Sequence, residues 1–286
     1  MRITTVSYRD VEQRIAVQAS DGYWAVSPQP ANLGDALATG EAETLLKQSD
    51  SWPRAGLDEL AFLAPIPYPR RNIICLGMNY AEHAEESLRA KGRELELPEA
   101  PVIFTKATTA VVGPYSDIVL DETVTQQLDW EVELALVIGK SGRYIAEERA
   151  FDHIFGYTVI NDLSARDLQF RHKQFFLGKS MDGSCPMGPW ITTADQIPDP
   201  HDLTVRSHVN EQLKQDGNTR DMVFRIPEII TTLAKVMTLQ AGDIIATGTP
   251  SGVGFARQPP EYLQPGDITR CYIEGLGEIA NRIVSA

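Results

Sequence analysis

The chain of 286 residues has only three cysteines, Cys75, Cys185 and Cys271. Their number is odd, their spacing is wide and no Cys-x-x-Cys motif occurs, so we expect neither a disulfide framework nor a cysteine-based zinc site. No apolar run approaches membrane-spanning length, and the first ten residues lack the apolar core of a signal peptide. These absences predict a cytoplasmic protein that no membrane anchors.

The chain also lacks a basic excess. It has 26 Lys and Arg against 39 Asp and Glu, which gives a net charge of −13. The acidic residues are spread along the chain rather than gathered in a tail. This distribution argues against nucleic acid and anionic membranes as partners. A composition of 43% hydrophobic and 23% charged residues is ordinary for a globular protein.

The chain divides in the sequence near residue 64. Three prolines at alternate positions in residues 64–71 predict a stiff, extended connector. We therefore predict a small N-terminal α/β module at 1–64 and a larger domain at 65–286. In the module we expect strands at 3–8, 14–18 and 23–26 and one helix at 32–47.

The larger domain is rich in predicted strands. Helical patterns are fewer and do not alternate regularly with strands, which disfavours a doubly wound parallel fold and favours a β-rich α+β domain. Strands are expected at 72–77, 102–105, 131–138, 156–161, 203–209, 243–247 and 269–273, and helices at 80–91, 147–151, 164–173 and 226–238.

The segment 129–139 carries the clearest signal. It alternates with period two, which places Val132, Leu134 and the apolar residues after them on one strand face, and Glu131 and Glu133 together on the other. Two adjacent carboxylates on one face are costly unless a charge compensates them. A hard divalent cation would do so. The segment alone is equally compatible with a solvated acidic edge.

Asp162 follows the next predicted strand and could supply a third oxygen ligand from the strand end. Taken alone, it is better explained as the N-cap of a helix that begins near Ser164. His83 and Glu86 are spaced i and i+3 on a predicted helix, where a carboxylate can orient an imidazole as a general base. Taken alone, an isolated pair of this kind is better explained by an exposed polar helix face. Residues 88–98, charged and broken by Gly92 and Pro98, form either a mobile lid or a surface loop.

Small residues surround Lys179 and Thr249. The segments around these two residues lack the glycine spacing of a P-loop or a dinucleotide fingerprint. The small neighbours would let backbone N–H groups and polar side chains approach a carboxylate.

Together these segments resemble the fumarylacetoacetate hydrolase family over residues 70–283, and the layout is closest to its long bacterial branch. That branch includes members that act on acylpyruvates, on oxaloacetate or on homoprotocatechuate-pathway intermediates. The resemblance rests on Gly77-Met78-Asn79-Tyr80 with His83 and Glu86; Phe104-Thr105-Lys106; residues 129–133; Asn161-Asp162 with Arg166 and Gln169; Lys179-Ser180, Cys185-Pro186 and Gly188-Pro189; and residues 247–254.

The resemblance implies a mixed β-roll for the larger domain, usually paired as a homodimer. It implies Mg²⁺ or Mn²⁺ held by Glu131, Glu133 and Asp162, and a base dyad of His83 and Glu86 at the start of a lid. Lys179 would orient the substrate and stabilise charge. Further substrate contacts would come from Lys106, Arg166, Gln169 and Thr249.

The implied substrate is a small 2-oxo acid. Hydrolysis of a 2,4-dioxo acid of the acylpyruvate or fumarylpyruvate type, giving pyruvate and a carboxylic acid, is the leading expectation. Decarboxylation of oxaloacetate and isomerisation of a 2-hydroxydienoate use the same site, so the family resemblance does not choose among them. A metal-binding protein without turnover is the alternative from another class.

Overall fold

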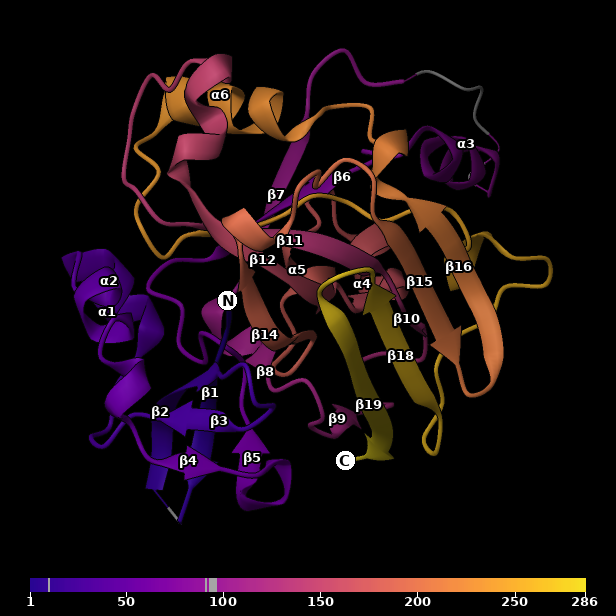
Figure 1. Cartoon of the computed structure of the whole chain (residues 1–286). Helices are drawn as coiled ribbons and strands as arrows, with labels where there is room; N and C mark the ends of the chain where they lie inside the picture. Colours follow the sequence, from indigo (N-terminus) through magenta and orange to yellow (C-terminus); the bar gives the residue numbers. More distant parts are fainter. Residues whose placement is uncertain (10, 91, 93–96) are drawn as a thin grey trace.

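The computed structural model describes residues 1–9, 11–90, 92 and 97–286 (Figure 1). Within these residues the strands form a 12-stranded sheet, a five-stranded sheet and a two-stranded pair. The largest sheet has the order β4-β3-β2-β1-β14-β12-β11-β17-β6-β7, with β5 beside β1 and β8 beside β14. Its strands are β1 (Arg2–Tyr8), β2 (Val11–Gln18), β3 (Trp24–Val26), β4 (Arg54–Ala55), β5 (Leu60–Phe62), β6 (Ile73–Gly77), β7 (Val102–Lys106), β8 (Val111–Val112), β11 (Val132–Ile138), β12 (Ile154–Asn161), β14 (Cys185–Thr193) and β17 (Ile244–Ala246).

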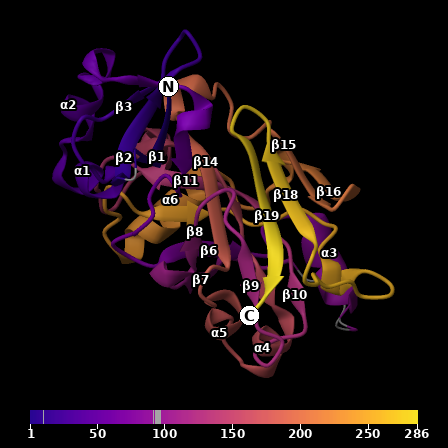
Figure 2. The same ribbon diagram turned by 90° about the horizontal axis from the view of Figure 1, so that it is seen from below.

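The five-stranded sheet has the order β16-β15-β18-β19-β9. It contains the last strand of the chain and lies on the right in Figures 1 and 2. Its strands are β9 (Ile118–Leu120), β15 (Thr204–Val209), β16 (Gln212–Asn218), β18 (Ile268–Ile273) and β19 (Gly277–Ser285), and the separate pair is β10 (Leu128–Asp129) with β13 (Ser164–Ala165). The α-helices are α1 (Leu33–Thr39), α2 (Ala42–Leu46), α3 (Ala81–Ala90), α4 (Arg166–Arg171), α5 (Phe176–Lys179) and α6 (Ile226–Val236). The 3-10 helices are η1 (Ser49–Ser51), η2 (Leu57–Glu59), η3 (Thr108–Ala110), η4 (Glu147–His153), η5 (Ala194–Gln196), η6 (Thr219–Asp221) and η7 (Gly254–Ala256). This strand-rich mixture confirms the predicted α+β class.

Strand β11 lies near the middle of the largest sheet, between β12 and β17. Its residues Val132, Leu134, Leu136 and Ile138 pack into a core that includes α6 and strands of the five-stranded sheet. Ala135 and Val137 pack on the opposite face, against a core that includes α1 and α2. The predicted period-two separation of faces is therefore confirmed, and both faces are buried.

The first 64 residues extend the same sheet. Strand β1 pairs antiparallel with β14, with Ile3 opposite Ile191. Ile3, Leu33 and Leu37 share one apolar core with Ile73 and Ile160 of the later chain. Backbone pairing and packing thus join the N-terminal strands directly to the rest of the molecule, and the division at residue 64 stays a prediction.

Three predicted helices have different boundaries or types. The single helix expected at 32–47 is wrong, because Gly40 adopts the left-handed conformation (φ 77°) and ends α1 before α2 begins. The helix expected at 164–173 is shorter, because Ser164 and Ala165 pair with β10 before α4 begins. The helix expected at 147–151 is the 3-10 helix η4.

Several strands were not predicted, and β14 is the most important because it joins β1 to β12. It contains Pro186, Gly188 and Pro189, residue types that normally argue against an interior strand. Among the described residues, no helix is long and apolar enough to cross a membrane.

Candidate active site

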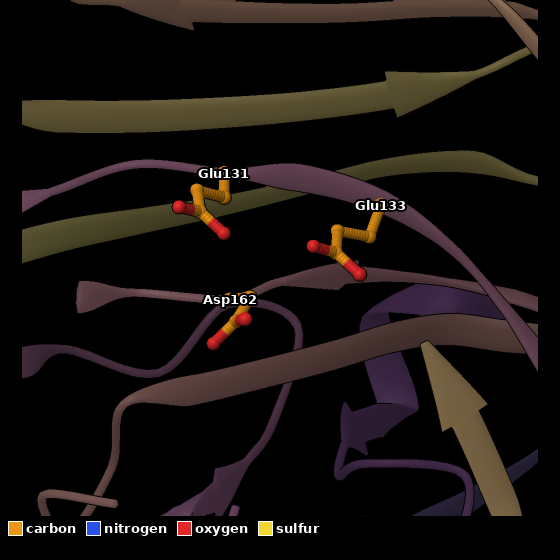
Figure 3. A group of neighbouring side chains, drawn as sticks. All are labelled: Glu131, Glu133 and Asp162. Atoms are coloured by element: carbon orange, nitrogen blue, oxygen red, sulfur yellow. The ribbon is translucent and has the colours of Figure 1, made fainter. Parts of the chain in front are cut away.

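Three carboxylates meet where β11 and β12 lie side by side. Glu131 directly precedes β11, Glu133 belongs to it, and Asp162 directly follows β12. The pairing of Val132 with Asn161 brings these positions together. One ligand oxygen from each side chain lies within 4.8 Å of the others (Figure 3). All three residues are buried, so the interpretation of Glu131 and Glu133 as a solvated edge is wrong.

The capping interpretation of Asp162 is also wrong. Helix α4 has Ala165 as its N-cap, and no side chain caps it. The carboxylate of Asp162 instead accepts hydrogen bonds from the ammonium groups of Lys106 and Lys179, at 2.7 and 2.8 Å. Asp162 therefore belongs to the buried charge cluster.

Cations partly neutralise this cluster. Lys179 Nζ lies 2.6 Å from Glu131 Oε2, and Arg166 Nη2 lies 2.7 Å from Glu131 Oε1. Burial would raise the pKa of Glu131, but the charges of Lys179, Arg166 and His83 outweigh it and hold that pKa well below its ordinary value. Burial lowers the pKa of Lys179, but Asp162 and Glu131 reverse this effect, so the pKa is raised and the group stays a cation.

Glu133 has a different environment. Its Oε2 accepts a hydrogen bond of 2.8 Å from the Gly248 N–H. Burial, together with the negative charges of Asp162 and Glu131, raises the pKa of Glu133 well above its ordinary value. A buried group of hard oxygen donors that repel one another is chemically suited to a divalent cation such as Mg²⁺ or Mn²⁺. Glu131, Glu133 and Asp162 are the residues that could hold it.

A small cavity of about 40 Å³ opens beside these carboxylates. Its wall combines charged groups with aromatic rings. The residues that line it include His83, Glu131, Glu133, Arg166, Gln169, Lys179, Thr249, Phe104, Phe170, Phe175 and Phe255. Residues far apart in the sequence thus surround a space suited to a small anionic molecule.

The predicted base dyad reaches this cavity from helix α3. His83 Nδ1 and Glu86 Oε1 lie 2.9 Å apart, and both side chains are largely buried. The alternative of an exposed polar helix face is therefore wrong. Because Nδ1 is engaged by Glu86, Nε2 is the nitrogen that can exchange a proton with a ligand. The proposed lid at 88–98 lies partly outside the described residues, which omit 91 and 93–96.

The predicted substrate contacts are not equivalent. Arg166 and Gln169 line the cavity, and Arg166 Nη1 donates to Gln169 Oε1 at 2.9 Å. Thr249 also lines it, but its hydroxyl donates to the Val132 carbonyl oxygen and accepts from Gln215. Lys106 is fully buried and is absent from the cavity wall as far as the described residues define it. Its ammonium supports Asp162 and the Leu163 carbonyl oxygen instead.

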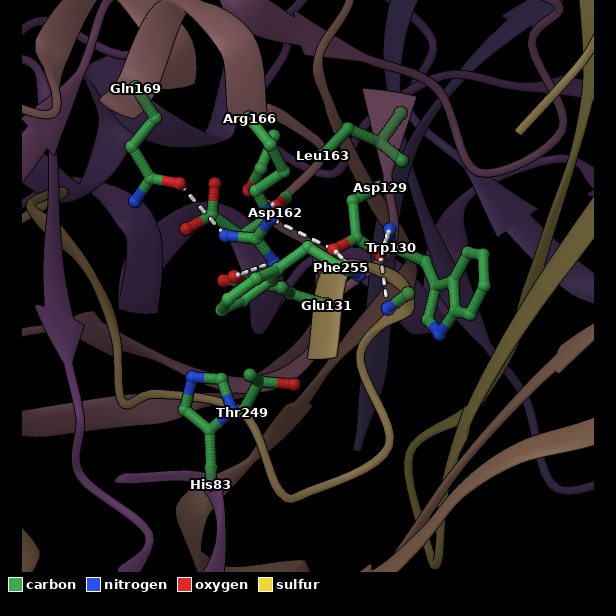
Figure 4. A network of polar contacts seen from close by, with 12 residues as sticks. His83, Asp129, Trp130, Glu131, Asp162, Leu163, Arg166, Gln169, Thr249 and Phe255 are labelled. Carbon is green, nitrogen blue, oxygen red and sulfur yellow. Dashed lines mark hydrogen bonds and ion pairs between the residues drawn. The ribbon is translucent and has the colours of Figure 1, made fainter. Parts of the chain in front are cut away.

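Sequence reasoning did not identify the phenylalanines in the cavity wall or the contact of Asp129 with Arg166. Phe255 lies over the Arg166 guanidinium, 4.4 Å from ring centroid to Cζ. Figure 4 shows Arg166 between Asp129, Glu131 and Gln169. No local pattern indicates the contacts of Arg166 with Asp129, Glu131 and Phe255, because these residues are tens of positions from Arg166 in the chain.

The chain is similar to proteins that are already known. Residues 72–284 match the family described as Fumarylacetoacetate (FAA) hydrolase C-terminal. The chain is 49% identical over 266 residues to the oxaloacetate tautomerase YisK of Bacillus subtilis, covering 89% of this chain and 87% of that protein. It is 42% identical over 253 residues to the mitochondrial oxaloacetate tautomerase FAHD2A of Homo sapiens, covering 88% and 77%.

Solved structures also match over the whole length of the chain. A fumarylacetoacetate hydrolase from psychrophilic Exiguobacterium antarcticum superposes with a TM-score of 0.86 at 42% identity and covers 100% of both chains. A maleylpyruvate hydrolase from Sphingobium sp. SYK-6, in complex with manganese(II) and pyruvate, has a TM-score of 0.79 at 32% identity and the same coverage.

Proposed function

Since the chain belongs to the fumarylacetoacetate hydrolase family of metal-dependent enzymes, we propose that it interconverts the enol and keto forms of oxaloacetate. The observation that carries this proposal is His83, held by Glu86, in the wall of the same cavity as Glu131 and Glu133. This arrangement supports the proposal, because an imidazole suited to proton exchange lies beside carboxylates that could hold a cation. The substrate is suggested by the bacterial and mitochondrial relatives, which are named oxaloacetate tautomerases.

The reaction is a proton transfer. On going from enol to keto, the C2 hydroxyl loses its proton, the C2–O bond becomes a carbonyl, and C3 gains a proton. His83 Nε2 would deliver or remove the proton at C3, while Glu86 holds Nδ1 and fixes the ring. A divalent cation at the carboxylate cluster would supply Lewis acidity toward the C2 oxygen. Lys179 and Arg166 would orient the carboxylates of the substrate and stabilise charge that develops on oxygen.

Hydrolysis of an acylpyruvate is the second candidate, and the likeness to the maleylpyruvate hydrolase supports it. There, His83 would take a proton from a water that attacks C4. The C3–C4 bond would then break to give pyruvate and a carboxylic acid. Decarboxylation of oxaloacetate is a further alternative. It would release CO₂ and leave the enolate of pyruvate, without an attacking water. Hydrolysis and decarboxylation would both break the C3–C4 bond, with and without water, whereas tautomerisation moves only protons; all three would use one site.

The deciding experiment supplies purified protein with Mg²⁺, Mn²⁺ or EDTA. It follows the ultraviolet absorbance of enol-oxaloacetate, and it measures pyruvate from oxaloacetate, acetylpyruvate and fumarylpyruvate. We expect metal-dependent loss of the enol, faster than with metal alone, without matching release of pyruvate. Pyruvate with an equal amount of organic acid from an acylpyruvate would replace this proposal by hydrolysis. Pyruvate and CO₂ from oxaloacetate would replace it by decarboxylation.

We also propose that two copies associate as a homodimer, as the family resemblance implies. Light scattering coupled to size-exclusion chromatography measures this directly. We expect twice the 31.6 kDa mass of the chain, and the mass of a single chain would contradict the homodimer.

A further inference from the structure

Asp129, which ends β10, has a fully buried carboxylate that accepts four N–H hydrogen bonds. Oδ1 accepts from the backbone of Trp130 at 2.8 Å and of Gly254 at 2.7 Å. Oδ2 accepts from the backbone of Phe255 at 3.0 Å and from Arg166 Nε at 2.8 Å. A carboxylate offers about four acceptor positions, so this one is fully used by groups that only donate.

The segment that Asp129 holds also contacts the base dyad. We call residues 251–255 the glycine loop. At its first end, the Gly252 N–H donates to both oxygens of Glu86, at 3.1 and 2.9 Å, and Ser251 Oγ donates to Glu82. At its other end, Gly254 and Phe255 donate to Asp129. The five-residue glycine loop therefore links the helix that carries His83 to the buried Asp129.

Glycine is required where the loop approaches its neighbours. At Gly252, φ is +106°, and an added Cβ would lie 2.1 Å from the Lys214 carbonyl oxygen. At Gly254, an added Cβ would lie 2.7 Å from Asp129 Oδ1. The close approach of the loop to Asp129 therefore depends on Gly254, and its close approach to Lys214 depends on Gly252.

Asp129 reaches the carboxylate cluster on its other side through Arg166. Arg166 places Nε on Asp129 and Nη2 on Glu131, with all three side chains buried. A guanidinium is planar and rigid, so fixing one edge fixes the direction of the other. A continuous set of hydrogen bonds thus runs from His83 through Glu86, the glycine loop, Asp129 and Arg166 to Glu131.

We infer that Asp129 is a positioning residue that sets the placement of the His83–Glu86 dyad relative to Glu131. It does so by clamping the glycine loop on one side and Arg166 on the other. The effect of this clamp on turnover rests on the proposed function, whereas its effect on the glycine loop does not. A displacement of about 1 Å between reacting groups can cost on the order of 100-fold in rate, so a clamp at this point controls catalysis without touching the substrate.

Asp129→Asn tests the clamp, because it keeps the shape but turns an amide donor toward two N–H groups. We expect faster hydrogen–deuterium exchange at the amides of residues 252–255. We also expect kcat to fall about 10- to 100-fold, with a smaller change in KM. The matched control is Asp243→Asn, since Asp243 is also a buried carboxylate paired with an arginine and a backbone N–H. Asp243→Asn should change neither the amide exchange of residues 252–255 nor kcat.

A second variant removes a contact to the same loop without changing charge. Trp130 Nε1 donates to the Gly252 carbonyl oxygen at 3.2 Å, and Trp130→Phe deletes this bond. We expect faster exchange in the loop and about a fivefold loss of kcat, the cost of one ordinary hydrogen bond. If Asp129→Asn does not fold, Trp130→Phe still shows whether the hold on the glycine loop controls kcat, and an unchanged kcat with faster exchange would overturn the proposal.

Unchanged exchange at residues 252–255 in the folded variants would overturn the clamp. So would faster exchange with kcat within twofold of the unmodified protein. If the unmodified protein does not act on oxaloacetate, the proposed function fails, and the exchange measurement still decides whether Asp129 holds the loop.

Discussion

Lys106 Nζ lies 2.7 Å from Oδ1 of Asp162, and neither side chain is exposed to solvent. The family resemblance implied a substrate contact for Lys106, but its ammonium faces Asp162 and a backbone carbonyl oxygen. Within the described residues it takes no part in the cavity wall. We therefore expect Lys106 to act on the site through Asp162.

Lys106→Met should lower stability much more than it alters substrate binding. Removing one partner of a buried ion pair costs about 3–5 kcal/mol, because it leaves an uncompensated buried charge. We expect a clear loss in the free energy of unfolding, measured by chemical denaturation, and a nearly unchanged KM in the folded protein. Lys235→Met, at an exposed position of α6, is the control. A tenfold rise in KM with unchanged stability would instead show a direct substrate contact.

His83→Ala should remove proton transfer and leave the cation site intact. A positioned general base contributes about 10²- to 10⁴-fold in rate, and we expect kcat to fall within this range. The affinity for Mn²⁺, measured by calorimetry, should stay nearly unchanged because His83 is outside the carboxylate cluster. His172→Ala, at an exposed position, should behave as the unmodified protein. Full activity of His83→Ala would remove this residue from the mechanism.

Glu86→Gln should separate orientation from charge in the dyad. Glutamine can still accept the N–H of Gly252, but it cannot stabilise an imidazolium at His83 as a carboxylate does. We expect kcat to fall about 10- to 100-fold, with the protein folded as before. Glu85→Gln provides a matched control, because Glu85 is the exposed neighbour on the same helix. Equal rates for the two variants would contradict a role for Glu86.

Glu133→Gln should stabilise the protein when a chelator is present and weaken its response to metal. The folded state raises the pKa of Glu133 above the value of 4.5 expected for an unfolded chain. The folded state then binds more protons than the unfolded state as pH rises from 4.5 toward the raised pKa, so stability falls through that window.

In EDTA at pH 7, we therefore expect the variant to melt a few degrees higher, about 2–4 °C, with the difference shrinking toward pH 4.5. Added Mn²⁺ should raise the melting temperature of the unmodified protein more than that of the variant. Glu211→Gln, at an exposed turn, should show neither effect. A lower melting temperature of Glu133→Gln in EDTA would refute this account.

The sequence alone determined the parts of the site that depend on neighbours in the chain. Period-two alternation placed Glu131 and Glu133 on one strand face, and an i, i+3 spacing placed His83 beside Glu86 on α3. The main strands of the larger domain were also predictable, because their apolar patterns are local. Gly40 was visible in the sequence as a helix terminator, although the prediction extended one helix through it.

The tertiary structure decided what depends on long-range pairing and burial. The register between β11 and β12 brings Asp162 to the two glutamates. Helix α4 begins at Arg166, so Asp162 is not its N-cap. Strand β14 forms despite its prolines because β1 and β12 pair with it on either side. The four bonds to Asp129 and the placement of Lys106 behind Asp162 depend on segments that meet only in the folded chain. Local periodicity carries no information about such contacts, because their energy comes from desolvation and hydrogen bonding between residues far apart in sequence.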